Sequence, residues 1–130
     1  MIVLDASAAL EWLLQTPSGL RVERFIRTRG TLHAPEILDL EVAQVLRRQT
    51  LAGLISVHRA EGALEDFRAM RLRRYRHVFL LHRIWQLRAN LTAYDAAYVA
   101  LAEALEATLV TRDQRIASAA GHSASVEVIQ

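Results

Sequence analysis

The chain has 130 residues, of which 52% are hydrophobic and 23% are charged, and its formal net charge is +2. This balance predicts one globular domain over residues 1–130 with a buried core, and it excludes a disordered tail or a tandem array. Cysteine is absent, which excludes a disulfide framework, a cysteine-ligated zinc site and a thiol nucleophile. All 16 basic residues are arginine, so chemistry that needs a lysine ammonium group is excluded as well.

The N-terminal stretch begins with apolar residues but lacks a basic leading segment. Asp5 and Glu11 interrupt it well before the roughly 20 apolar residues that are needed to cross a bilayer. We therefore expect neither a signal peptide nor a membrane span. Together with the absence of cysteine, this favours a cytoplasmic protein.

The first half of the chain alternates short apolar runs with helical patterns. We predict a strand at 2–4, helices at 7–14 and 20–29 with a turn at 16–19 between them, a strand at 32–34 and a helix from Pro35 to about residue 50. The run at 2–4 is too short for a core helix and precedes Asp5, which is typical of a buried strand. Pro35 suits the first helical position, where its missing N–H would have no helical partner.

The second half continues the same alternation. We predict a helix from Ser56 to about 70, a short basic strand at 73–78, helices around 80–89 and 93–106, a strand at 108–111, a helix at 114–120 and a strand at 126–129. This order predicts the α/β class, as a three-layer α/β/α domain with a central, mainly parallel sheet of roughly five strands. Such sheets bind ligands outside the carboxyl ends of their strands.

Four carboxylates lie where these elements would bring them to one crevice. Asp5 and Asp113 follow predicted strands, Asp95 lies near the start of a helix within its apolar arc, and Glu41 faces the apolar side of its helix. Each aspartate alone has an ordinary alternative role as a helix cap. Together, four carboxylates would repel one another and raise each other's pKa values unless cations neutralise them. The set therefore predicts a metal site.

Oxygen ligands without cysteine or paired histidines indicate a hard cation, Mg²⁺ or Mn²⁺. Such a site suits phosphodiester hydrolysis, because the cation polarises the phosphate and lowers the pKa of a bound water. Ser7 and Thr111, each two residues from a carboxylate, are candidates for positioning a water or a phosphate oxygen. Their alternative role is local capping by the hydroxyl groups.

A basic segment without any acidic residue lies between Asp66 and Asp95. Its candidates for RNA binding are Arg71, Arg73, Arg74 and Arg76. A solvated face with a few salt bridges explains the same pattern. At the level of function, the segment from Arg68 to Arg88 supports an alternative: a non-catalytic module that binds RNA or a partner protein. A phospho-accepting receiver domain is disfavoured because the chain has no lysine.

Four motifs follow one another along nearly the whole chain: VLDASA at 3–8, PEILDLEVAQVLRR at 35–48, LTAYDAAYVALA at 91–102 and LVTRD at 109–113. Together they resemble the motifs of VapC-type PIN-domain ribonucleases. The resemblance implies that Asp5, Glu41, Asp95 and Asp113 form the catalytic site, with Asp5, Asp95 and Asp113 as metal ligands. It also implies a metal-dependent endoribonuclease toxin that acts on structured RNA, forms a homodimer and is neutralised by a VapB-like antitoxin.

One departure from the family pattern follows the last motif. Many relatives carry a further acid shortly after the last aspartate, whereas Gln114, Arg115 and Ile116 follow Asp113 here. The choice between one metal ion and two therefore stays open. Arg112 or Arg115 could bind the phosphate of the substrate, or they could be exposed charges at the start of the last helix.

Overall fold

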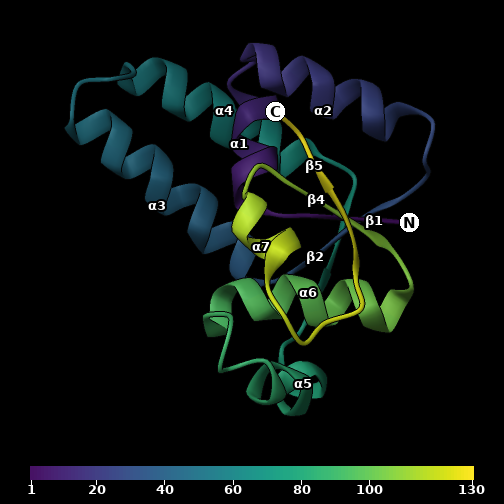
Figure 1. The fold of residues 1–130 in the computed structure, drawn as a ribbon. Coiled ribbons are helices and arrows are strands. Elements are labelled where there is room, and N and C mark those ends of the chain that lie inside the picture. The colour runs from purple at the N-terminus through teal and green to yellow at the C-terminus, as the bar shows by residue number, and fades with distance from the viewer.

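The computed structural model describes residues 1–130 and contains a central sheet of five parallel strands in the order β3-β2-β1-β4-β5 (Figure 1). The strands are β1 (Ile2–Leu4), β2 (Leu32–Pro35), β3 (Leu72–Tyr75), β4 (Thr108–Thr111) and β5 (Ser125–Val128). From the central β1 the chain first adds strands on one side, and β4 then begins the other side. The carboxyl ends of β1 and β4 therefore flank the point where the strand order reverses, the usual place for a binding crevice.

Helices cover both faces of this sheet. They are α1 (Ala6–Leu13), α2 (Pro17–Arg27), α3 (Ile37–Leu51), α4 (Val57–Ala69), the short 3₁₀ helix η1 (Val78–Leu80), α5 (Leu81–Gln86), α6 (Ala93–Leu105) and α7 (Gln114–Ser118). Figure 1 shows α1 to α4 gathered on one side of the sheet and α5 and α6 on the other. The predicted three-layer α/β/α architecture is confirmed, and the sheet is parallel throughout. None of the helices combines the length and the apolar character needed to span a bilayer.

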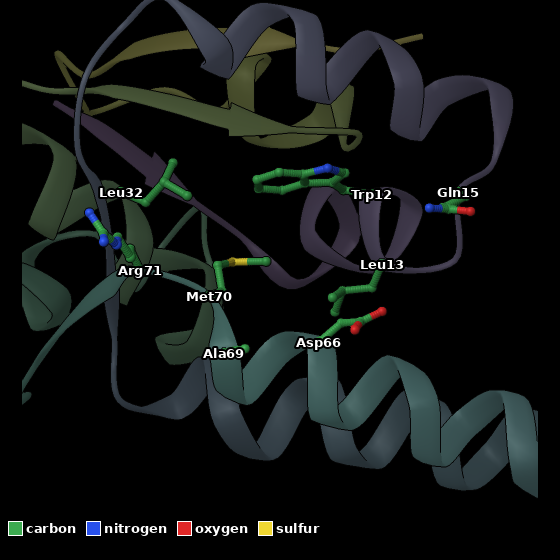
Figure 2. A pocket seen from close by; sticks show the side chains of 8 residues that line it. All are labelled: Trp12, Leu13, Gln15, Leu32, Asp66, Ala69, Met70 and Arg71. Atoms are coloured by element: carbon green, nitrogen blue, oxygen red, sulfur yellow. The ribbon is translucent and has the colours of Figure 1, made fainter.

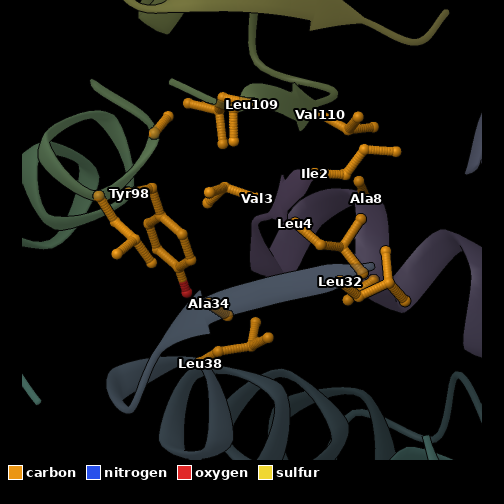
Figure 3. Close-up of a cluster of buried hydrophobic side chains, with 14 of the residues drawn as sticks. Ile2, Val3, Leu4, Ala8, Leu32, Ala34, Leu38, Tyr98, Leu109 and Val110 are labelled. Atoms are coloured by element: carbon orange, nitrogen blue, oxygen red, sulfur yellow. The ribbon is translucent and has the colours of Figure 1, made fainter. Parts of the chain in front are cut away.

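The core lies between the sheet and the helices on each face (Figure 3). Ile2, Val3 and Leu4 of β1 are all buried, because helices cover the central strand from both sides. This explains why β1 reads as an unbroken apolar run. On α6, residues 96–102 are all buried, and four of them are alanines. These small side chains let α6 lie close to β1, β2 and β4.

Several predicted boundaries were wrong for local reasons. The predicted turn at 16–19 is the first turn of α2, because the Thr16 side chain caps the helix by accepting a hydrogen bond from the Gly19 N–H at 3.0 Å. Pro35 ends β2 instead of opening α3, since it lies in register with Tyr75 of β3. The basic strand ends at Tyr75, and the helix predicted around 80–89 is divided into η1 and α5.

Candidate active site

Asp5 directly follows β1 and is the N-cap of α1. One of its oxygens, Oδ1, accepts hydrogen bonds from the Ala8 N–H at 3.0 Å and from the Ser7 hydroxyl at 2.7 Å, and the Thr111 hydroxyl donates to Oδ2. The residue is only 5% exposed, and this burial raises the pKa of its carboxyl group. Asp5 is thus a fixed, buried carboxylate that no cationic side chain contacts.

Asp95 lies in the first turn of α6, where its N–H donates to the capping hydroxyl of Thr92 at 3.1 Å. Partial burial raises the pKa of Asp95, and the negative charge of Asp113 raises it further. Its carboxylate forms no ion pair. Asp95 therefore adds a second negative charge that is poorly compensated by the protein.

Glu41 reaches the same region from α3 and meets α6 through Tyr98. The Tyr98 hydroxyl donates to Oε1 of Glu41, and the tyrosine is almost fully buried, with 2% exposure. Burial, together with the hydrogen bond to Glu41, raises the pKa of the Tyr98 phenol well above its usual range, so the phenol stays a donor. The hydrogen bond fixes one oxygen of Glu41, and no protein group binds the other.

Asp113 follows β4 and is the N-cap of α7. Arg115 holds both of its oxygens, with Nε donating to Oδ1 at 3.0 Å and Nη2 donating to Oδ2 at 2.7 Å. The hydrogen bonds from Arg115 lower the pKa of Asp113 below its usual value. Asp113 is therefore the one aspartate of the set with a cationic partner.

These four side chains line a single pocket of about 380 Å³, although they come from separate parts of the chain. Its complete lining is Asp5, Ala6, Ser7, Glu41, Arg48, Asp95, Tyr98, Asp113, Arg115 and Ile116. The pocket lies beyond the carboxyl ends of β1 and β4, as the parallel sheet predicts. The arrangement is a concave, acidic surface with two guanidinium groups beside it.

The PIN domain family matches residues 2–122 of the chain, a range that includes all four carboxylates. The chain belongs to the PIN-domain family. Ribonuclease VapC12 of Mycobacterium tuberculosis (strain ATCC 25618 / H37Rv) is 44% identical to this PIN domain over 130 residues and is covered to 99%, as is the chain itself.

Two solved structures show the same fold at low sequence identity. PAE2754 from Pyrobaculum aerophilum has a TM-score of 0.73 with 22% identity, and the match covers 98% of this chain and 83% of that one. VapBC2 from Rickettsia felis, solved bound to a DNA fragment from their promoter, has a TM-score of 0.72 with 16% identity and 100% coverage of both chains. Both likenesses show the fold alone, and it is the α/β fold that the order of strands and helices predicted.

Two residues that line the pocket of this PIN domain, Arg48 and Tyr98, were not among the predicted site residues. Arg48 follows the inward-facing Glu41 by seven residues on α3, which is two helical turns along the same face, and this spacing could have indicated it. Tyr98 similarly follows Asp95 by three residues on α6. Its helical pattern predicted only a core position, and the contact with Glu41 depends on how α3 and α6 pack.

The hydroxyl groups of Ser7 and Thr111 face the Asp5 carboxylate instead of open space. The Thr111 hydroxyl also accepts a hydrogen bond from the Asp113 N–H at 3.0 Å, so it links two carboxylates of the PIN-domain site. Arg112 points away from the pocket, where its Nη1 pairs with Glu11 at 3.0 Å. Its backbone N–H donates to the Ser7 hydroxyl at 2.9 Å. These residues support the carboxylates, and Arg115 is the arginine of this turn that lines the pocket.

The four arginines predicted to bind RNA lie on or beside the edge strand β3, and none lines the acidic pocket. Arg74 pairs with Asp39 at 2.7 Å. Arg71 lines a different, largely apolar pocket of about 400 Å³, which Figure 2 shows between the Trp12 and Met70 side chains. Within the longer basic segment, Arg68 and Arg83 also pair with carboxylates, so three of its seven arginines form ion pairs within the protein.

The donor chemistry of the acidic pocket fits a hard divalent cation. All of its candidate ligand atoms are carboxylate oxygens, and Asp5 and Asp95 carry raised pKa values without a cationic partner. No group of three acidic or histidine side chains is gathered closely enough to hold a metal ion as they stand. Arg115 is hydrogen-bonded to the Asp113 carboxylate, and Tyr98 is hydrogen-bonded to the Glu41 carboxylate. Binding of a metal ion would therefore require these side chains to change partners.

Proposed function

We propose that this PIN domain is a VapC-type endoribonuclease toxin that hydrolyses phosphodiester bonds of structured RNA with the help of Mg²⁺ or Mn²⁺. The observation that carries the proposal is the convergence of Asp5, Glu41, Asp95 and Asp113 on one pocket at the switch point of the sheet. The 44% identity to Ribonuclease VapC12 over the full chain supports the same reaction class.

In this proposal Asp5, Asp95 and Asp113 hold the cation, and Glu41 handles the proton. When bound, Mg²⁺ or Mn²⁺ supplies polarisation of the phosphate and activation of a water molecule. The hydroxyls of Ser7 and Thr111 keep the Asp5 carboxylate in one orientation. Glu41 is oriented by Tyr98 through one oxygen, and its other oxygen is free to accept a proton from the attacking water.

Substitution of Asp95 by Asn tests the reaction. Asn keeps the size and the helix position of the side chain, so Asp95→Asn is expected to retain the fold and to abolish Mn²⁺-dependent cleavage of a structured RNA. Asp39→Asn is the matched control, because Asp39 lies outside the pocket and pairs with Arg74. Undiminished cleavage by Asp95→Asn, with a wild-type circular dichroism spectrum, would remove the basis of the proposal.

We further propose a VapB-like antitoxin, a homodimer and a cytoplasmic location as the setting of this activity. The structural likeness to VapBC2 of Rickettsia felis supports the partner class. Exposed apolar side chains on η1, α5 and α6 offer a surface for a second copy, among them Val78, Phe79, Leu81, Trp85 and Tyr94. Induced expression with and without a candidate antitoxin, scored for growth arrest, tests the pairing. Sedimentation velocity tests the dimer.

A further inference from the structure

Arg115 occupies the oxygens of Asp113 that a cation would need. Its guanidinium group holds Oδ1 and Oδ2 in a two-point contact at 3.0 and 2.7 Å. This geometry is the strong form of a carboxylate–arginine pair. A cation and the guanidinium group therefore cannot both take this carboxylate face.

The exposure of Arg115 allows its ion pair with Asp113 to separate. The Arg115 side chain is 87% exposed, whereas that of Asp113 is 23% exposed. Beyond Asp113, the guanidinium group donates no other hydrogen bond within the protein, and Asp95 attracts it only at longer range. Water can solvate the guanidinium group as soon as it leaves, so its hydration offsets part of the loss of the two hydrogen bonds. Asp5 differs, because its partners are neutral hydroxyls and a backbone N–H that do not compete in charge.

From these contacts we infer that Arg115 is an internal competitor of the divalent cation and leaves Asp113 when the cation binds. The inference rests on the proposed metal-dependent function and adds the regulation of its site. In the absence of the cation, Arg115 neutralises the Asp113 carboxylate. Cation binding replaces one positive partner of Asp113 by another and releases a guanidinium group at the edge of the pocket.

Titration of the purified protein with Mn²⁺ alone, followed by electron paramagnetic resonance, tests the exchange. Arg115→Gln is expected to bind Mn²⁺ about two- to fivefold more tightly than the wild type, which corresponds to the removal of an exposed ion pair. Arg48→Gln is the matched control, because Arg48 lines the same pocket without an ion pair to any carboxylate. It removes the same charge and should change the Mn²⁺ affinity less.

A double variant separates competition from general electrostatics. In the Asp113→Asn background, the change from Arg115 to Gln should tighten Mn²⁺ binding less than it does in the wild type, because only the longer-range interaction of Arg115 with Asp95 remains. If Asp113→Asn weakens binding while Arg115→Gln matches the wild type or Arg48→Gln, the competition is refuted and the proposed function stands. If Asp113→Asn and Asp95→Asn bind Mn²⁺ as well as the wild type does, the proposed metal site itself fails, and the inference fails with it.

Nuclear magnetic resonance of the arginine Nε–H groups provides a second readout that needs no enzymatic activity. On saturation with Mg²⁺, the Arg115 Nε–H resonance is expected to shift as its hydrogen bond to Asp113 is lost. The Arg83 Nε–H, which donates to Glu103 at 2.8 Å outside the acidic pocket, is the internal reference. An unchanged Arg115 resonance in protein that has bound Mg²⁺ would overturn the exchange.

Discussion

Asp5 serves the fold and the site with the same carboxylate. It caps α1 through the Ala8 N–H and holds the hydroxyls of Ser7 and Thr111, while it lines the acidic pocket. The capping alternative and the metal-ligand prediction are therefore compatible, because a single carboxylate can serve both. The position of Asp5 directly after a predicted strand could indicate both roles, helix capping and metal binding. It could not indicate that Thr111, 106 residues away, would donate to the same group.

Substitutions of Asp5 should separate these two roles. Asp5→Asn retains an oxygen for the cap and removes a buried charge whose pKa is raised by desolvation. We expect it to be at least as stable as the wild type at neutral pH. Asp5→Ala loses the cap and leaves the two hydroxyls without their acceptor, so it should be about 1–2 kcal/mol less stable than Asp5→Asn. Urea unfolding measures the difference, and equal stability of the two variants would contradict the capping role.

The ion pair of Glu103 with Arg83 should contribute to the dependence of stability on acid pH. Its hydrogen bonds with Arg83, and further ones from Ser123, lower its pKa from 4.5 to about 2. Because the folded state holds the proton less tightly, the stabilisation is complete above pH 4.5 and is lost as the pH falls towards 2. Glu103→Gln should remove about 1–2 kcal/mol at neutral pH, an amount reduced by the partial exposure of Arg83.

The test is thermal unfolding between neutral and acid pH. Because Glu103→Gln lacks the ion pair with Arg83, its thermal stability should fall less steeply than that of the wild type as the pH is lowered. Glu23→Gln, which removes a pair with Arg27 on the surface of α2, should leave the profile unchanged. Parallel profiles for wild type and Glu103→Gln would refute the assignment.

At the scale of elements, the close contact between α1 and α2 depends on one glycine. A Cβ atom at Gly19 would lie 2.0 Å from the Glu11 carbonyl oxygen and 3.0 Å from the Trp12 Cα, so the two helix backbones would have to separate. The sequence identified Gly19 as part of a turn, because Thr-Pro-Ser-Gly is a common turn composition. In the structure these residues form the cap and first turn of α2, and the glycine is needed for packing.

Alanine substitutions at two glycines should therefore have opposite effects. Gly19→Ala is expected to cost about 1–3 kcal/mol because backbone atoms block the new methyl group. Gly62→Ala, inside α4 with nothing within 4 Å of the added atom, should stabilise the protein by about 0.5–1 kcal/mol through helix propensity. Chemical denaturation of both variants decides, and a stabilised Gly19→Ala would show that α2 is free to move.

Helices and strands with strong periodic patterns were predicted well, while their boundaries depended on neighbours. The apolar run of β1 and the amphipathic pattern of α6 are local properties and needed no tertiary information. Pro35 could not be placed from its own sequence, because its role as the last residue of β2 is set by the pairing with Tyr75. The partners of Asp113 also escaped prediction, since Arg115 reads equally well as an exposed helix residue.

At the scale of the whole molecule, the strand order explains why distant carboxylates meet. β1 and β4 are neighbours in the sheet, although 103 residues lie between Leu4, the last residue of β1, and Thr108, the first residue of β4. Parallel pairing then places Asp5 and Asp113 at the same edge. The sequence predicted this edge from the α/β alternation alone. It did not predict where the basic segment lies, because the position of β3 as an edge strand depends on the complete fold.

The two sides of the acidic pocket should also differ in how often they open. β1 is the central strand and is entirely buried, whereas α7 is a five-residue helix that packs against the edge strand β5. Backbone amides of Val3 and Leu4 should exchange with deuterium only when the whole domain unfolds. Those of α7 should exchange through local openings that need far less free energy.

Native-state hydrogen exchange with increasing denaturant distinguishes these two classes of amide. Equal protection of β1 and α7 would show that the pocket opens and closes as one cooperative unit. Unequal protection would show that Asp5 belongs to the segment that unfolds last and that Asp113 belongs to a segment that opens locally. The pocket would then have a rigid side at β1 and a side at α7 that opens locally, and the α7 side carries Arg115.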